Sequence, residues 1–205
     1  MASPKGTSLG TIRHGPTAWT EDKRIQGRAD IPLSDEGRGM VSRWRLPPGL
    51  APGNDDVQWV SSPLRRATET ARLLGAAEPA IEPRLAEMDY GQWEGRRLPD
   101  LRRELGDAMA ENEARGLDFR PLGGESPREV QERLRPWLSD LGRRRRPTLA
   151  VTHHGVIRAL LSLATGWPMT GRPPDRLAWG AIHYFLVDDE GGVAVDRLNV
   201  SLEPE

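Results

Sequence analysis

Thr11-Ile12-Arg13-His14-Gly15 is the stretch that decides the fold, because two further stretches of the same kind follow it. They are Ser62-Pro63-Leu64-Arg65-Arg66 and Thr152-His153-His154-Gly155. Each comes after a short, largely apolar run that is typical of a strand, and the second and third lead into predicted helices. If the runs are parallel strands, their carboxyl ends share one edge of a sheet. We therefore expect the arginines and histidines at this edge, where open α/β sheets bind ligands.

The remaining sequence alternates between strand and helix patterns. Ser34 before Asp35-Glu36 is typical of a helix N-cap, and Ser126-Pro127-Arg128-Glu129 is typical of a capping box. Ser62-Pro63 is predicted to open a helix with proline at its first position. Strand patterns lie at 9–12, 57–60, 148–152, 182–187 and 193–198, the last two as a hairpin or edge pair. This order predicts a three-layer α/β/α sandwich with a mostly parallel central sheet, formed by residues 1–205 as a single domain.

The stretch from Arg96 to Gly124 differs in character from the rest of the chain. It is charged, it is interrupted by Pro and Gly, and its apolar residues are sparse, among them Leu101, Leu105 and Met109. We expect a small helical excursion over the sheet edge that acts as a lid or insertion.

Composition excludes several classes of function. The chain of 205 residues has a formal net charge of −1, which gives no general attraction to nucleic acid or to acidic membranes. With no cysteine, disulfides and thiol chemistry are excluded. Residues 1–6 lead into no long apolar segment, so we expect no signal peptide, no membrane span and a cytoplasmic location. Trp167, Trp179 and Tyr184 could include an exposed interface patch, but the sequence leaves the oligomeric state open.

The predicted sheet edge favours an anion. All but two of the 29 cationic side chains are arginines, which suit bidentate contact with phosphate. Arg13 and His153 end two predicted strands, and Arg65 lies in the first helical turn after a third. The helices that begin near Ser62 and Gly155 point their positive N-termini at the same edge. Together these features predict a site that handles a phosphoryl group.

At this level of detail the chain resembles the histidine phosphatase superfamily, which includes the cofactor-dependent phosphoglycerate mutases. The resemblance runs from about Thr11 to about Arg158. The matching stretches are Thr11–Thr17, Ile25–Arg28, Asp30–Ser34, Ser61–Ala71, Leu85–Gly95, Gly124–Ser126 and Val151–Arg158. Their number and order make the match far more specific than any one of them.

The resemblance implies a role for each matching residue. His14 would attack phosphorus and form a phosphohistidine intermediate. Arg13, Arg65 and His153 would hold the oxygens of the transferring group, and Glu87 would protonate the leaving group and then help to activate water. Substrate-binding residues would be Arg13, Arg65, His153, Thr17, Gln26 and Gly27. The resemblance implies neither a metal nor a cofactor, since arginines supply the electrostatic stabilisation.

Several residues have an alternative. Arg66 could replace Arg65, with the other of the two as an ordinary surface arginine. Asp89 or Glu94 could replace Glu87 as the acid. The spacing to Arg158 in the family selects His153 over His154, and a metal site made from these two adjacent histidines is disfavoured because neighbouring side chains on a strand point in opposite directions.

Three functions from different classes remain. The leading prediction is a phosphomonoester hydrolase that acts on a small phosphorylated metabolite, in a branch similar to α-ribazole phosphatase. Mutases of this family usually carry Arg directly after the acid glutamate and often Glu after the Arg-His-Gly motif, whereas this chain has Met88 and Pro16. A mutase is the first alternative, and a non-catalytic phosphate-binding protein is the second.

Overall fold

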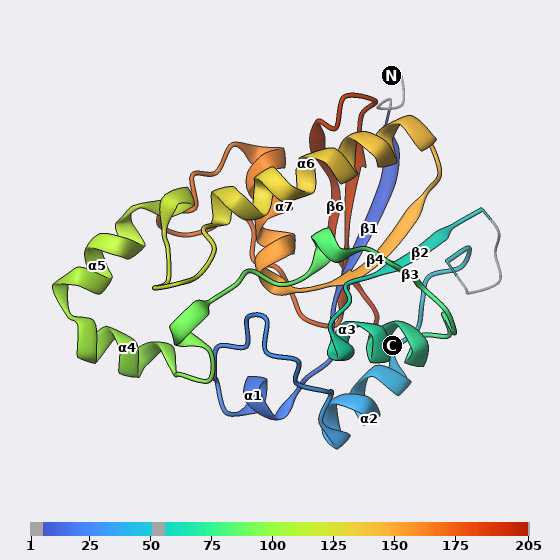
Figure 1. The fold of residues 1–205 in the computed structure, drawn as a ribbon. Coiled ribbons are helices and arrows are strands. Elements are labelled where there is room, and N and C mark those ends of the chain that lie inside the picture. The colour runs from blue at the N-terminus through green and yellow to red at the C-terminus, as the bar shows by residue number, and fades with distance from the viewer. Residues whose placement is uncertain (1–5, 51–55, 205) are drawn as a thin grey trace.

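The computed structural model describes residues 6–50 and 56–204, so the ends of the predicted 1–205 domain lie outside the described residues. A six-stranded sheet forms its centre, in the order β3-β2-β4-β1-β5-β6 (Figure 1). The strands are β1 (Thr7–Arg13), β2 (Gln58–Ser61), β3 (Ala80–Ile81), β4 (Thr148–Thr152), β5 (Ala181–Val187) and β6 (Val193–Ser201). The first four are parallel, while β5 is antiparallel to β1 and β6 is antiparallel to β5. The predicted mostly parallel sheet with a C-terminal hairpin is confirmed.

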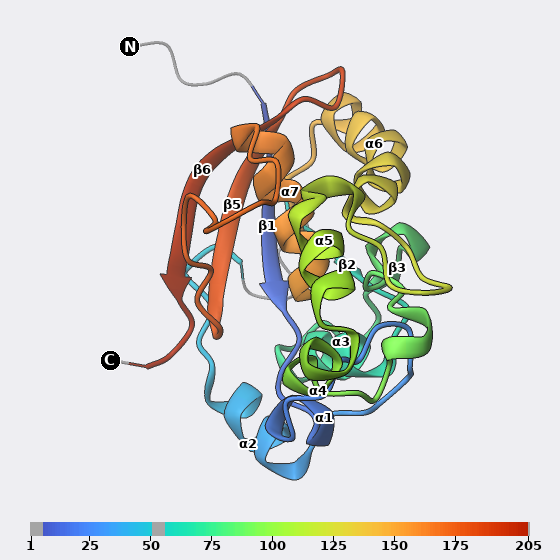
Figure 2. The ribbon, with the colours of Figure 1, turned by 90° about the vertical axis from the view of Figure 1, so that its left-hand side faces the viewer.

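Helices cover both faces of this sheet, because its strands are apolar on both sides. Leu9 packs in a core cluster with the inner sides of α6 (Pro127–Arg144) and α7 (His154–Thr165). Ile12, three residues along β1, packs in a second cluster with the side of α2 (Asp35–Arg43). A fourth helix of the sandwich, α3 (Arg65–Leu73), places Ala67 and Ala71 against β4. Figure 2 shows α6 and α7 beside the sheet in edge view, with α2 and α3 near the ends of the strands. The three-layer α/β/α architecture follows.

The 96–124 excursion is helical, as expected. It contains α4 (Leu98–Leu105), α5 (Asp107–Ala114) and the 3-10 turn η3 (Gly116–Asp118), and Figure 1 shows α4 and α5 on the opposite side of the molecule from β2 and β3. Leu101 and Met109 are buried with Trp93 in a small cluster of their own. The few apolar residues of this stretch therefore attach it to the rest of the chain.

Three short elements complete the chain. They are α1 (Ala18–Glu21), η1 (Pro83–Leu85) and η2 (Gly91–Trp93). Within the described residues, no helix has both the length and the apolar character needed to cross a membrane.

The predicted helix caps are confirmed at two positions and wrong at a third. Ser34 accepts a hydrogen bond from the amide of Gly37, and Ser126 forms a capping box with Glu129. The third helix does not begin at Ser62-Pro63. Ser62 donates its amide to the carbonyl of Val151 and so continues the β2–β4 pairing, and α3 begins only at Arg65.

Candidate active site

His14 follows the carboxyl end of β1 and is almost fully buried. Its amide donates to the carbonyl of Thr152 (3.0 Å), which extends the pairing of β1 with β4. Its Nδ1 lies 2.7 Å from the carbonyl oxygen of Gly15. Because that oxygen can only accept, Nδ1 carries the proton and Nε2 keeps a free lone pair. The tautomer suits a nucleophile that attacks through Nε2.

His153 comes directly after β4 and is fully buried. Its ring centroid lies 5.1 Å from that of His14, with the two planes tilted by 55°. Its Nε2 is 2.7 Å from the hydroxyl oxygen of Ser62, while its Nδ1 is buried and has no hydrogen-bond partner. The parallel strands β1 and β4 thus bring together the two histidines that the sequence placed at one sheet edge.

Both histidines are held neutral. Burial lowers the pKa of His14 well below its ordinary value, and the charges of Arg13 and Arg66 lower it further. Burial likewise lowers the pKa of His153, with added contributions from Arg66 and from His14. A neutral His14 has its lone pair available at any pH near neutrality.

Arg13 is held by an aromatic ring. Its guanidinium carbon lies 3.7 Å from the centroid of the Trp179 ring, a cation–π contact. Its Nε is buried without a hydrogen-bond partner. Burial lowers the pKa of Arg13 to about 10, and the carboxylate of Glu87 opposes this shift, so the side chain stays charged at neutral pH.

Arg66 is completely buried and lies near enough to the two histidines for its charge to lower their pKa values. Its terminal nitrogens donate to the carbonyl oxygens of Ala29 and Gly27, both at 2.8 Å. Its Nε has no hydrogen-bond partner. Among the described residues, neither Arg66 nor Arg13 forms an ion pair with a carboxylate. A fully buried cation, Arg66, and a partly buried one, Arg13, each with an unused donor, form a site for an anion.

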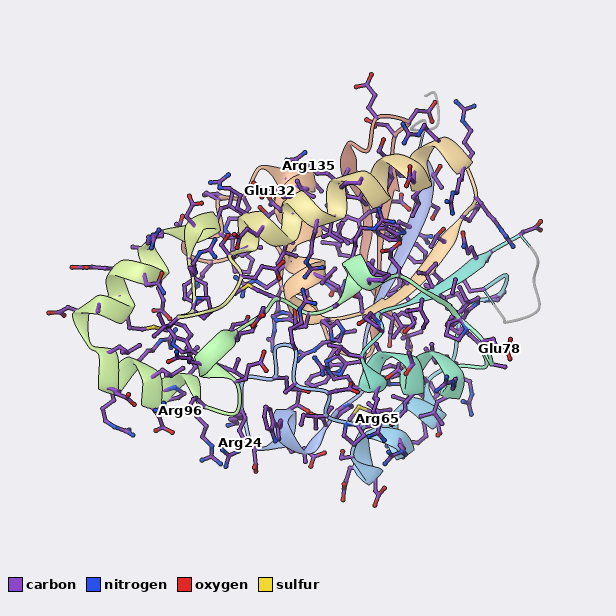
Figure 3. The ribbon with its side chains drawn as sticks, in the orientation of Figure 1. Arg24, Arg65, Glu78, Arg96, Glu132 and Arg135 are labelled. Atoms are coloured by element: carbon purple, nitrogen blue, oxygen red, sulfur yellow. The ribbon has the colours of Figure 1, made fainter. Side chains whose placement is uncertain are left out.

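The sequence placed Arg65 in the site and Arg66 at the surface, and the structure reverses this. The side chain of Arg65 is 60 % exposed and lies 3.7 Å from the carboxylate of Glu69. Figure 3 labels it on α3, near α2. The reason is helical geometry. The fully buried residues of α3 are Arg66 itself with Ala67, Thr70 and Ala71.

The last three of these residues fix the direction in which α3 faces the protein. At 100° per residue, Arg65 lies about 170° from that direction, whereas Arg66 lies about 90° from it. Arg65 therefore faces solvent, and the expected phosphate contact falls to Arg66.

Glu87 lies two residues after η1 and is 9 % exposed. Its Oε1 accepts from the amide of Met88 (2.9 Å) and its Oε2 from the amide of Gly155 (3.3 Å) at the start of α7. A Cβ at position 155 would lie 2.4 Å from Oε1, so glycine there allows the carboxylate to keep this position. The carboxylate is thus held beside the helix that follows His153.

The alternative carboxylates have other partners. Asp89 accepts from the amide of Gly91, and Glu94 accepts from the amides of Arg28 and Ala29. Glu94 therefore supports the loop that carries the carbonyl acceptors of Arg66. Glu87 is the carboxylate whose charge acts most strongly on both Arg13 and Arg66, where it opposes the effect of burial on their pKa values.

Thr17, Gln26 and Gly27 lie in the segment that contacts Arg66. The Thr17 hydroxyl donates to Oε1 of Gln26 (3.0 Å), and both side chains are buried. Gly27 has a φ of +53°, and its carbonyl accepts from Arg66. Thr17 thus orients Gln26, and Gly27 positions Arg66.

The structure also separates His154 from His153. His154 is the first residue of α7 and lines a cavity beside the site, whereas His153 faces His14. This geometry agrees with the selection of His153. His183 is a buried residue of β5.

Sequence reasoning missed two residues of the site. Ser62 contacts His153 as described above, and Trp179 donates its indole N–H to the carbonyl oxygen of His14 (3.0 Å) while stacking on Arg13. Trp179 is separated from His14 by 165 positions, and no local pattern points to the pairing. Trp167 and Tyr184 are each only 7 % exposed, so the suggested aromatic patch is not an exposed surface.

The arrangement combines two arginines that can bind an anion, a neutral histidine that can act as a nucleophile, and a carboxyl group whose charge acts on both arginines. In the part of the chain that the structure describes, no three His, Asp or Glu side chains gather in a way that could hold a metal ion.

Comparison with known proteins supports this chemistry. The model of the histidine phosphatase superfamily (branch 1) matches residues 9–200. The chain belongs to this superfamily. Phosphoglycerate mutase-like protein 4 of Arabidopsis thaliana is 32 % identical over 162 residues, which cover 75 % of this chain and 69 % of that protein. Glucosyl-3-phosphoglycerate phosphatase of Mycolicibacterium vanbaalenii is 31 % identical over 176 residues, which cover 79 % of this chain and 76 % of that protein.

Solved structures of the superfamily share the fold over almost the whole chain. A mycobacterial glucosyl-3-phosphoglycerate phosphatase, solved as a complex with VO3, has a TM-score of 0.72 and 27 % identity, with 95 % of this chain and 100 % of that chain covered. The crystal structure of a protein from Thermus thermophilus has a TM-score of 0.71 and 28 % sequence identity. That match covers 95 % of this chain and 99 % of the Thermus chain. Membership of the histidine phosphatase superfamily supports phosphatase or mutase chemistry at the site.

Proposed function

We propose that this histidine phosphatase is a metal-independent phosphomonoester hydrolase that acts on a small phosphorylated metabolite through a phosphohistidine intermediate. One observation carries the proposal. The unprotonated Nε2 of a neutral His14 lies in a buried cluster with His153, Arg13 and Arg66, and neither arginine is ion-paired with a carboxylate among the described residues. Such a cluster binds a phosphoryl group and attacks it.

The first step transfers the phosphoryl group to the enzyme. The lone pair on Nε2 of His14 forms a bond to phosphorus, and the bond from phosphorus to the ester oxygen breaks. Glu87, in its protonated form, gives its proton to that oxygen, so the product leaves as an alcohol. Arg13 and Arg66 neutralise the charge on the oxygens that stay on phosphorus.

The second step releases inorganic phosphate. A water molecule attacks phosphorus and loses a proton to the Glu87 carboxylate, while the bond from phosphorus to Nε2 breaks. His14 regains its lone pair and Glu87 its proton. The hydrogen bond from Nδ1 of His14 to the Gly15 carbonyl stabilises the positive charge that the ring carries while it is phosphorylated.

Hydrolysis is favoured over the mutase reaction by the residue after the acid. Met88 is 3 % exposed and packs in the main core cluster, so the position where the mutases carry Arg holds an apolar side chain. The named relatives include both a mutase-like protein and a phosphatase, which keeps phosphoglycerate mutase chemistry as the second candidate.

Trapping of the intermediate tests the proposal. Wild type mixed with an aryl phosphate and quenched should hold acid-labile phosphate, and His14→Ala should hold none and should have no turnover. EDTA should leave the activity unchanged, and a bisphosphate primer should not be required. Full activity of His14→Ala would refute the mechanism. Activity only with a bisphosphate primer would establish a mutase, and the absence of any turnover would establish a binding protein.

A further inference from the structure

A cavity of about 430 Å³ lies beside the active site, and the mechanism above leaves it unused. Its walls come from the first turns of α7, from the segment after Glu87 and from the 96–124 excursion, whose position relative to α7 is visible in Figure 1. Met88 and Gly155 line it, and these two residues supply the amides that hold Glu87. An ester oxygen that Glu87 protonates therefore belongs to a leaving group that extends into this cavity.

The α7 side of the cavity carries a cation. His154 and Arg158 both line it, and they lie four residues apart on one face of α7. The Arg158 guanidinium carbon lies 5.0 Å from the centroid of the Trp167 ring, and Trp167 is buried. Within residues 6–50 and 56–204, Arg158 has no ion pair with a carboxylate. It is therefore a positioned positive charge without a negative partner in that part of the chain.

The other cation on the cavity wall is already neutralised. Nε and a terminal nitrogen of Arg102, on α4, both donate to Oε1 of Glu113 on α5, at 3.0 and 2.8 Å. This pair joins the two helices of the excursion. Of the two arginines, Arg158 is the one whose charge is available to a ligand.

The remaining wall is apolar and aromatic. Trp93 and Phe119 meet edge to face with their ring centroids 5.6 Å apart, and Tyr90 and Leu98 also line the cavity. Such a surface binds the flat face of a ring. His154 adds a neutral imidazole, because burial and the charges of Arg13 and Arg158 lower its pKa to about 3.

We infer that this cavity is the leaving-group pocket and that it selects phosphomonoesters whose alcohol carries a ring or similar apolar body and one carboxylate, with Arg158 as the specificity-determining residue. The inference rests on the proposed hydrolase function. The size is consistent, since Arg158 lies five residues after His153, or about 7.5 Å along the helix axis. A single ring separates a phosphate from a carboxylate by a comparable span.

Matched substrates test the pocket. Phenyl phosphate, para-carboxyphenyl phosphate and its uncharged analogue para-carbamoylphenyl phosphate are compared by kcat/KM. Wild type should prefer the carboxylate over the carboxamide by about 10- to 100-fold, the range expected for a hydrogen-bonded charge pair. Arg158→Met should bring this ratio near unity and leave phenyl phosphate hydrolysis nearly unchanged. Arg158→Lys, which keeps the charge, should retain part of the preference.

The double change Arg102→Met and Glu113→Gln is the matched control, because it removes an arginine from the same cavity together with the carboxylate that pairs with it. It should keep the wild-type ratio. Equal rates for carboxylate and carboxamide in wild type, or an unchanged ratio in Arg158→Met, would overturn the inference.

The phenyl phosphate arm reports on the proposed hydrolase function separately from the pocket. If no aryl phosphate is hydrolysed, binding still decides the role of Arg158. Calorimetry then measures the affinity of His14→Ala for para-carboxyphenyl phosphate and for its uncharged para-carbamoylphenyl analogue. The pocket is supported if His14→Ala binds the carboxylate compound more tightly than the carboxamide compound and the double variant His14→Ala/Arg158→Met does not. Equal binding of the two compounds to His14→Ala refutes the pocket.

Discussion

Replacement of Arg66 by methionine provides the sharpest test of the site, because Arg65 is the adjacent residue and faces solvent. Arg66→Met removes a buried cation that lies beside both histidines. One such charged donor contributes about 2.7–4 kcal/mol to the transition state, so kcat should fall about 10²- to 10³-fold. Steady-state hydrolysis of an aryl phosphate measures this loss.

The same substitution also affects stability. The carbonyls of Gly27 and Ala29 lose a charged donor, which costs about 1–3 kcal/mol for each. Removal of a buried cation that has no ion pair among the described residues relieves part of its desolvation cost. We therefore expect a lowered Tm, and the kinetic comparison is made well below it. Arg66→Lys keeps the charge but not the two-pronged contact, and its activity should lie between those of wild type and Arg66→Met.

Arg65→Met is the matched control. Its side chain is exposed, and its ion pair with Glu69 contributes at most about 1 kcal/mol to stability. Its kcat should stay close to that of wild type. A 100-fold loss in Arg65→Met together with near-normal activity in Arg66→Met would refute the placement of these two side chains and restore the assignment suggested by the sequence.

Three further predictions follow from the contacts around the histidines. Gly155→Ala places a Cβ 2.4 Å from Oε1 of Glu87, so the carboxylate must move. The kcat for an alkyl phosphate should then fall about 100-fold. An equal loss with an aryl phosphate of an acidic phenol would contradict the role of Glu87 as the acid. Trp179→Phe keeps a ring under Arg13 but loses the hydrogen bond to the His14 carbonyl, so kcat should fall by about fivefold at unchanged KM. Trp179→Leu also loses the ring and should reduce kcat further. A change in KM alone would show that Trp179 does not position Arg13 and His14. Because the folded-state pKa of His14 is below its ordinary 6.5, the unfolded chain binds more protons as the pH falls through about 6.5. Stability is therefore full above that pH and should decline below it by up to about 1.4 kcal/mol per pH unit for this histidine. Denaturant unfolding at about pH 5 and about pH 7.5 measures the slope, which His14→Gln should reduce.

The sheet was predictable because the signals for it are local. The apolar runs before His14 and His153 are short and end in polar residues, and the Ser34 and Ser126 caps are encoded within four residues of chain. Once two such strands are parallel neighbours, the residues after them must meet. This is why the histidine pair could be expected from the sequence.

The assignment of the second arginine is wrong for a physical reason. Ser62-Pro63 has the pattern of a helix start, but the amide of Ser62 is used by the sheet and α3 begins later. Measured from Ala67 and Ala71 alone, the two arginines lie at similar angles around the helix, about 120° for Arg66 and about 140° for Arg65. The buried face is decided by Thr70, whose hydroxyl accepts from the amide of Gly15 (2.9 Å). A polar residue buried by a contact 55 positions away carries no signal in the sequence of the helix.

Other contacts could not be predicted from any local pattern. The bond from Trp179 to His14 joins residues separated by 165 positions, and that from Gly155 to Glu87 joins residues separated by 68. The 96–124 excursion was expected to be helical, but the cavity that it forms with α7 depends on how Leu101 and Met109 pack against Trp93. Such packing is a tertiary property.

The unpaired Nε atoms of Arg13 and Arg66 have a consequence for any measurement of how stable this chain is. Arg66 loses its hydration on folding and Arg13 loses most of it, and within the described residues no carboxylate ion pair replaces it. A bound oxyanion therefore stabilises the folded chain and not the unfolded one. The free energy of unfolding then rises with the logarithm of the phosphate concentration, by about 2.7 kcal/mol at one hundred times the dissociation constant. Stability in a phosphate buffer and in a buffer free of oxyanions are accordingly two different quantities, and their difference reports the affinity of the site for inorganic phosphate.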